Sequence, residues 1–180
     1  MEILDYVRSF DLLVSDTKQV LEFVEPTDAN VITYSHRLYA IFLRGCTDFE
    51  SLARDLLIRR GCTKDINKLN VMDYCTLESD LKLETVKIDF LLWRPTPRRL
   101  LPFQGWSKAQ PPLSWYSDYN VVKHNRQAEF PRANLGAVVE TLAAQFAFIS
   151  KACDYEWPTG DWSRHHSRGE FWREPFLMHE

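Results

Sequence analysis

The segment 115–126, WYSDYNVVKHNR, carries the side chains of this chain best suited to chemistry. The segment reads as a helix, on which Tyr116, Asn120 and His124 are four residues apart and share one face. Of these three, His124 has the side chain that titrates near neutral pH, so it is the candidate for proton transfer. Asn120, one turn earlier, is placed to orient His124 or its substrate.

Charged and phenolic side chains flank this polar edge. Tyr119 and Lys123 share the neighbouring stripe of the helix, and Lys123 and Arg126 are candidates to hold a phosphate. Arg126 follows His124 by two residues, which places it about 200° around the helix. The two side chains therefore converge only if a second subunit supplies one of them. The alternative to a role of His124 in proton transfer is a structural one, in which His124 hydrogen-bonds a neighbouring helix inside a bundle.

The composition is that of one folded domain without a global affinity for polyanions. The chain has 180 residues, of which 45% are hydrophobic, 13% aromatic and 26% charged, which is enough for a core. It has 22 Lys and Arg against 25 Asp and Glu, a net charge of −3, so nucleic acid could bind only through a local basic cluster. Two such clusters are Arg94, Arg98 and Arg99, and Lys123, Arg126 and Arg132.

The compartment expected from the sequence is the cytoplasm. The four cysteines are scattered and form no CxxC pair, so we expect reduced thiols rather than a zinc ribbon or a disulfide framework. The N-terminus has no basic n-region or cleavage site, and no apolar run has the 18 or more residues of a membrane span. We expect no cofactor and no contact with a membrane.

Hydrophobic periodicity predicts mainly helices around this segment. Apolar residues spaced three and four apart predict one helix over residues 3–24 and a second over about 31–60, with Thr27, Asp28 and Asn30 as possible N-caps of the second. A short helix is expected around 71–78. Ser114 is expected to cap the helix with the polar edge. Pro131 or Asn134 opens a last helix, which buries Leu135, Val138, Val139, Leu142, Phe146 and Ile149.

One β-hairpin and an irregular tail complete the expected fold. Alternating apolar residues over 86–93 predict a strand, the sequence RPTPR a turn, and residues 99–104 a returning strand. The predicted domain covers residues 1–152, with the hairpin at about 86–104. The tail 153–180 is rich in aromatic residues, with Pro158, Gly160, Gly169 and Pro175 preventing long regular elements. We expect it to pack on the bundle.

No metal site is expected. Adjacent His165 and His166 lack a carboxylate or cysteine spacing that would complete a ligand set, and read as surface residues. Glu50 and Arg54 are four residues apart on the second helix and predict an ion pair. In the expected fold, both could also line a groove beside His124.

Three segments of the chain carry a family resemblance: RGCTDFESLARDLL, VMDYCTLE and PLSWYSDYNVVKHNRQAEFPRANLGAVVETLAAQF. Together they resemble a bacterial group of HEPN-like proteins, over roughly residues 30–150. It implies a HEPN-like bundle of four to five helices that frequently dimerises. It also implies a place in bacterial toxin, abortive-infection or CRISPR-linked systems, in which many members are metal-independent ribonucleases.

The family's catalytic signature is an Arg followed by a polar residue, three further residues and a His. On this chain the polar residue matches Asn120 and the His matches His124, but the Arg position is Tyr119. A phenol cannot neutralise phosphate charge as a guanidinium does, although Lys123 or Arg126 could substitute for it. Tyr116, Tyr119, Lys123 and Arg126 are therefore the candidate residues for binding phosphate or RNA.

These observations leave three functions open. The first is a HEPN-like module of a defence or toxin-type system that binds RNA, a nucleotide or a partner protein such as an antitoxin, with degenerate nuclease chemistry. The second is an active metal-independent endoribonuclease, a homodimer in which His124 acts as general acid or base. The third is an unrelated helical protein with a structural or interaction role.

Overall fold

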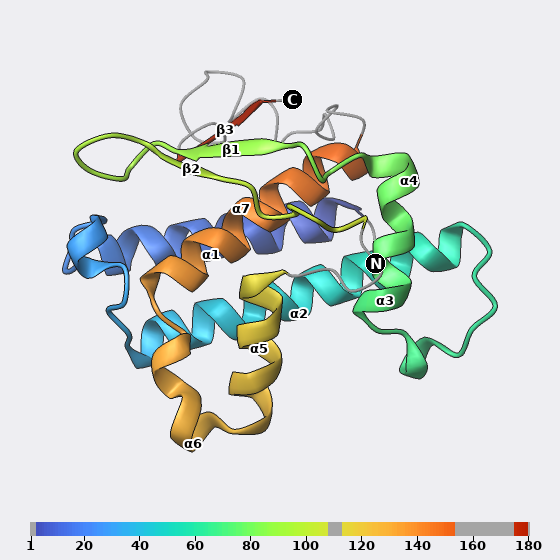
Figure 1. Ribbon diagram of the computed structural model, residues 1–180, viewed down its shortest axis with the longest axis horizontal. Helices are drawn as coiled ribbons and strands as arrows, with labels where there is room; N and C mark the ends of the chain where they lie inside the picture. The colour runs from blue at the N-terminus through green and yellow to red at the C-terminus, as the bar shows by residue number, and fades with distance from the viewer. Residues whose placement is uncertain (1–2, 108–112, 154–174, 180) are drawn as a thin grey trace.

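The computed structural model describes residues 3–107, 113–153 and 175–179, and Figure 1 labels the main elements. In chain order they are α1 Ile3–Leu21, a 3-10 turn Asp28–Asn30, α2 His36–Arg59, a 3-10 turn Ile66–Lys68, α3 Val71–Tyr74, a 3-10 turn Cys75–Leu77, α4 Glu78–Leu81, β1 Lys87–Phe90, β2 Arg98–Leu100, α5 Ser114–His124, α6 Arg126–Glu129, a 3-10 turn Phe130–Arg132, α7 Leu135–Ala152 and β3 Phe176–His179. The prediction of a mainly helical fold is confirmed.

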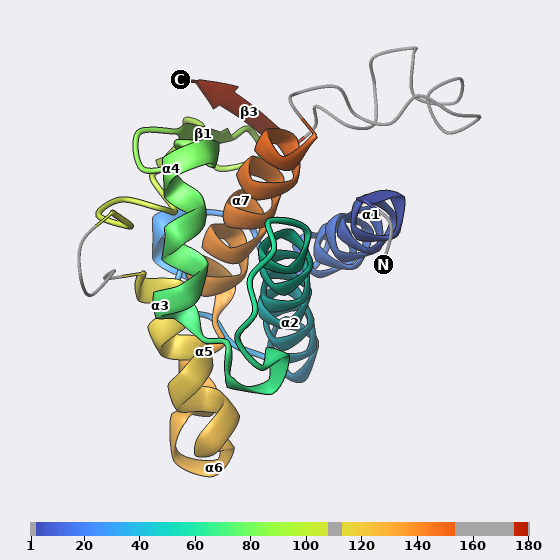
Figure 2. The same ribbon diagram turned by 90° about the vertical axis from the view of Figure 1, so that its right-hand side faces the viewer.

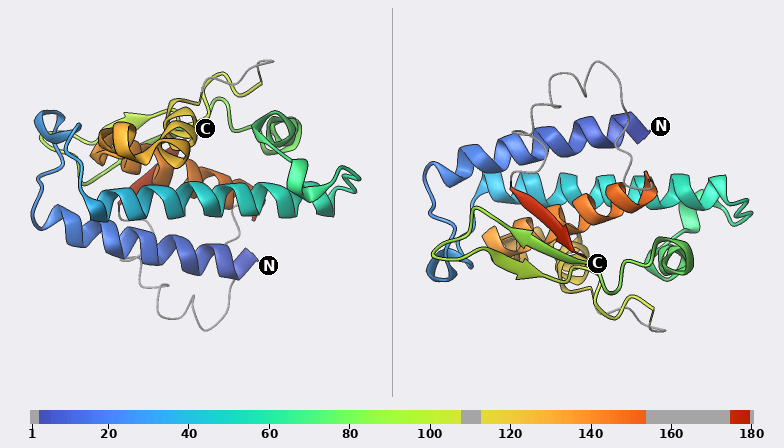
Figure 3. Two further views of the ribbon diagram at one scale, coloured as in Figure 1. Left: turned by 90° about the horizontal axis from the view of Figure 1, so that it is seen from below. Right: turned by 90° about the horizontal axis from the view of Figure 1, so that it is seen from above.

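Three long helices form the frame of the molecule. α1 and α2 lie side by side and run in opposite directions, and α7 packs against both of them (Figures 1 and 3). On the other side of α2 from α1 lie α3, α4 and α5 (Figure 2). The helices pack closely at Gly45 of α2, where an added Cβ would lie 2.8 Å from the side chain of Thr141 on α7. A side chain at Gly45 would therefore push α2 and α7 apart.

The last helix is the central element, and its predicted buried stripe is confirmed. Asn134 caps it by accepting a 3.0 Å hydrogen bond from the Ala137 backbone, whereas Pro131 lies in the preceding 3-10 turn. Residues 135–152 are long and apolar enough to cross a membrane, but 83% of them are buried inside the fold. Burial by the neighbouring elements accounts for the apolar character of α7.

The start of the second helix differs from the prediction. It begins at His36 rather than near residue 31, because the hydroxyl of Ser35 accepts a 3.1 Å hydrogen bond from the Leu38 backbone and caps the helix. Thr27 precedes the 3-10 turn, makes no capping hydrogen bond through its side chain, and is not the cap of α2. The first helix likewise ends at Leu21, before the predicted residue 24.

The predicted hairpin is present but shorter, and it belongs to a three-stranded sheet. β1 pairs antiparallel with β2 on one edge and with β3 on the other, in the order β2-β1-β3. Ile88 and Phe90 are buried on the side of β1 that packs against α7. The sequence predicted no strand in the tail, yet Phe176–His179 forms β3 and Phe176 is buried. Residues 154–174, and most of the predicted tail with them, lie outside the described residues.

An aromatic cluster joins α2, α5 and α7. The ring of Phe49 lies 5.0 Å from the rings of Trp115 and Phe148, and 6.0 Å from that of Tyr116. The Trp115 indole also donates a 2.9 Å hydrogen bond to the Pro102 carbonyl. The apolar positions of α5 are therefore fixed against the core, which sets the rotation of the helix and decides where its polar residues lie.

Candidate functional site

The polar helix α5 ends at His124, and the chain then changes direction. Asn125 adopts φ −139° and ψ 59°, which is outside the helical region, so Arg126 starts the separate helix α6. The prediction that Arg126 continues the helix of His124 was therefore wrong.

The start of α5 also differs from the prediction that Ser114 caps it. Ser114 is the first residue of the helix, and Leu113 precedes it without a side-chain cap. The Ser114 hydroxyl instead donates a 3.1 Å hydrogen bond to Glu140 on α7.

The side of α5 that faces α2 holds a buried polar network. The Tyr116 hydroxyl donates a 2.7 Å hydrogen bond to Oε1 of Glu50, a residue that is only 6% exposed. The other carboxylate oxygen, Oε2, lies 3.3 Å from the Arg54 guanidinium and 3.9 Å from the Lys123 ammonium. The predicted Glu50–Arg54 ion pair is thus confirmed, and the same carboxylate also joins α2 to α5.

Tyr119, at the position of the signature arginine, extends this network to the surface. Its phenol is 2% exposed and its hydroxyl accepts a 3.1 Å hydrogen bond from Lys123. That ammonium also lies 4.9 Å from the centre of the Tyr119 ring. The side chain of Lys123 remains 46% exposed, so a fixed cation lies where the polar network reaches solvent.

Burial and charge keep these groups in defined protonation states. Burial, followed by the hydrogen bond to Glu50, raises the pKa of Tyr116 well above its usual range, so its phenol stays protonated. The hydrogen bond to Tyr119 and the charge of Glu50 raise the pKa of Lys123, so its ammonium stays charged. Tyr116 therefore acts as a hydrogen-bond donor to Glu50, and its hydroxyl is occupied within the fold.

The remaining face of α5 is open to solvent. Asn120 is half-buried and His124 is exposed. Within the part of the chain that the structure describes, His124 makes no hydrogen bond or ion pair, so no bundle contact of that kind holds its imidazole. The structure thus divides the predicted edge, with Tyr116 and Tyr119 inside the fold and His124 outside.

Arg126 belongs to a second cluster, formed where α6 meets the start of α2. Its guanidinium lies 4.5 Å from the centre of the Tyr39 ring and 5.7 Å from that of Phe130. A guanidinium nitrogen also lies 3.4 Å from Nδ1 of His36. We call Arg126, His36, Tyr39 and Phe130 the arginine–aromatic cluster. A further ring, that of Tyr34, lies edge-on to Phe130 at 5.7 Å and is 50% exposed.

Arg126 is the only member of this cluster that the sequence analysis named as a candidate site residue. His36 and Tyr39 lie in the first turn of α2, and nothing in the local sequence marks them as different from other residues of a helix. Only the break at Asn125 brings Arg126 to them, across 90 residues in the case of His36. In the predicted basic group Lys123, Arg126 and Arg132, the charge of Arg132 is already paired with Asp118 and Glu129.

The described residues hold no group of three or more His, Cys, Asp or Glu side chains suited to a metal ion. His165 and His166, which the sequence interpretation placed on the surface, lie outside the described residues. The side chains of the described site offer hydrogen bonds, cationic contacts, aromatic rings and an exposed imidazole.

Comparison of the chain with protein-family models, with curated proteins and with solved structures finds no match in any of the three.

Proposed function

We propose that this protein is a HEPN-like module of a bacterial defence or toxin-type system, located in the cytoplasm, that binds single-stranded RNA at the end of α5 and the arginine–aromatic cluster. The observation that carries the proposal is the exposed Arg126 guanidinium, which lies over the Tyr39 ring at 4.5 Å and also contacts the Phe130 ring and His36. Unpaired bases stack on rings and on guanidinium planes, and Arg also contacts the phosphate backbone.

The end of α5 supplies the second part of the proposed RNA site. His124 is exposed at the last residue of the helix, only two positions before Arg126. Lys123 is held charged beside them by Tyr119 and Glu50. This arrangement supports a role for the Lys123 ammonium in neutralising phosphate charge, the role of the arginine that the family signature has at the position of Tyr119.

The net charge of −3 for the whole chain supports a local RNA contact rather than a global one. A few cationic contacts to phosphates give an affinity that falls as salt concentration rises, with a shallow slope. Stacking adds about 1–3 kcal/mol for each base. We therefore expect short single strands to bind more tightly than duplex RNA of the same length, whose bases are not free to stack.

Fluorescence anisotropy with a labelled single-stranded RNA, a duplex RNA and a single-stranded DNA tests this proposal. Arg126→Ala should weaken binding of the single-stranded RNA by about tenfold or more, as expected for loss of a stacked cation. Lys68→Ala is the matched control, because it removes an exposed cation from the 3-10 turn Ile66–Lys68. Equal affinity of wild type and Arg126→Ala, or failure of the wild type to bind any of the three probes, would contradict the proposal.

A further inference from the structure

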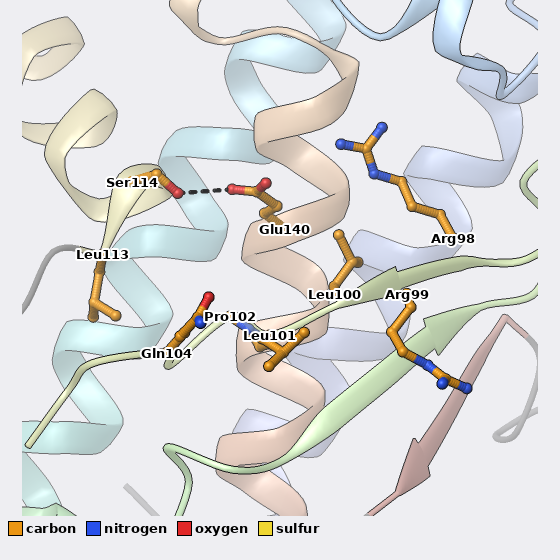
Figure 4. A pocket seen from close by; sticks show the side chains of 9 residues that line it. All are labelled: Arg98, Arg99, Leu100, Leu101, Pro102, Gln104, Leu113, Ser114 and Glu140. Carbon is orange, nitrogen blue, oxygen red and sulfur yellow. Dashed lines mark hydrogen bonds between the residues drawn. The ribbon is translucent and has the colours of Figure 1, made fainter.

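A separate cavity opens at the other end of α5. It has a volume of about 380 Å³ and lies between β2, the segment 101–104, the first turn of α5 and the middle of α7. Figure 4 shows the side chains around it. Leu100, Leu101, Pro102 and Leu113 contribute the apolar part of its wall, and the larger accessible part of the wall is polar. Its volume falls in the range of small-molecule sites, and its polar lining favours a polar ligand.

One carboxylate faces this cavity from the central helix. Glu140 is the only acidic residue of α7, a helix whose other side chains are mostly buried and apolar. The Ser114 hydroxyl donates a 3.1 Å hydrogen bond to its Oε2. In the described part of the chain, this is the one hydrogen bond that the Glu140 carboxylate makes. A carboxylate can accept several hydrogen bonds, so Glu140 retains acceptor capacity toward the cavity.

One guanidinium faces the cavity from the hairpin. Arg98 lies across the opening from Glu140 (Figure 4). It stacks over the Trp93 ring at 4.8 Å and lies 3.5 Å from Asp28, whose side chain is 88% exposed. Such an exposed ion pair contributes little energy, so most of the five N–H donors of Arg98 remain available to a ligand.

The neighbouring Arg99 is not available in the same way. It makes two hydrogen bonds, of 2.8 and 2.9 Å, to the carboxylate of Asp89. In Figure 4 its guanidinium points away from Glu140. The cavity therefore presents one anionic group and one cationic group at separate places on its wall.

We propose that this cavity binds a small zwitterion of the amino-acid class, whose ammonium group donates to Glu140 and whose carboxylate accepts from Arg98. The carbon skeleton of the ligand packs on Leu101, the exposed apolar residue of the wall. A simple anion would meet the Glu140 carboxylate, and a simple cation would leave Arg98 without a new partner, so a molecule with both charges fits the wall best. This site is independent of the RNA site proposed above.

Isothermal titration of the wild-type protein with the common α-amino acids, and with γ-aminobutyrate as an ω-amino acid, tests the ligand class. At least one of them should bind with a Kd of about 1 mM or tighter. The N-acetyl and methyl ester derivatives of that amino acid, which lack the ammonium and the carboxylate respectively, should each bind at least about tenfold more weakly. Absence of saturable binding by every amino acid, or equal binding of either derivative, would overturn the proposal.

Two pairs of variants test the assigned groups. Glu140→Gln keeps the shape of the side chain and removes its charge, with Glu22→Gln as the exposed control outside the cavity. Arg98→Gln is matched by Arg37→Gln at the exposed start of α2. Each cavity variant should weaken amino-acid binding by at least about tenfold, while the controls should bind as the wild type does. Unchanged binding in both cavity variants, with circular dichroism showing them folded, would overturn the assignment.

Discussion

The hydroxyl of Tyr116 donates a 2.7 Å hydrogen bond to the buried carboxylate of Glu50, across 66 residues of sequence. This bond joins α5 to α2 and holds the inner side of the candidate site. Because Glu50 is 6% exposed, water cannot easily replace a lost donor.

Tyr116→Phe should therefore lower the free energy of unfolding by about 1.5–3 kcal/mol, the range for a hydrogen bond to a charged group. Tyr34→Phe is the matched control, because Tyr34 is 50% exposed and should change stability by less than about 0.5 kcal/mol. Urea denaturation of both variants measures the difference. Equal stability of Tyr116→Phe and wild type would show that the Tyr116–Glu50 bond contributes nothing net.

Asp11 on α1 predicts a dependence of stability on pH. Burial raises the pKa of its carboxyl from 3.8 to about 8, and its Oδ2 has no hydrogen-bond partner among the described residues. Between these two pH values the folded state holds a proton that the unfolded chain releases. The contribution of Asp11 to stability therefore falls as pH rises from about 4 to about 8.

Asp11→Asn removes this titration. It should raise the free energy of unfolding by about 1–2 kcal/mol at pH 8 and change it little at pH 4, because a protonated carboxyl and an amide are both neutral. Urea midpoints at the two pH values, with Asp16→Asn on the same helix as control, check this. A loss of stability in Asp11→Asn that is the same at both pH values would contradict the prediction.

The resemblance to HEPN-like proteins predicts a homodimer, and we expect its interface to include the outer face of α5. Val121 is 38% exposed on that helix, next to Asn120. Val121→Arg should place a charge in the interface and raise the monomer fraction at micromolar concentration. Leu12→Arg is the control, since Leu12 is 53% exposed on α1. Light scattering measures the mass of each protein, and a monomeric wild type would rule out the dimer.

If the protein cleaves RNA as well as binding it, cleavage should persist in EDTA and leave a cyclic phosphate or 3′-phosphate. His124→Ala should then lower the rate by about 10² to 10⁴, the usual contribution of a general acid or base. Asn120→Ala should have a smaller effect because an orienting residue does not transfer the proton. Gel analysis of a labelled RNA separates these outcomes, and full activity in a folded His124→Ala protein would exclude His124 as the catalytic group.

Local patterns predicted the main helices and the hairpin correctly. The apolar stripe of α7 and the alternation in β1 depend on residues within a turn or two of each other, so periodicity alone reveals them. The Glu50–Arg54 pair was predictable for the same reason. Residues 176–179 were not predicted as a strand, because β3 forms only by pairing with β1 nearly ninety residues earlier in the chain.

The sequence by itself determined that α5 carries Tyr116, Tyr119, Asn120, Lys123 and His124, and which of them share a stripe. Only the tertiary structure decided which of these residues are buried. Packing of Trp115 against Phe49 fixes α5 on the core, so that Tyr116 and Tyr119 are buried, whereas His124, the last residue of the helix, is exposed. The meeting of Arg126 with His36, and of Ser114 with Glu140, also depends on how helices pack across long stretches of chain. Helical spacing specifies neighbours along one helix, whereas contacts between helices depend on the packing of the whole core.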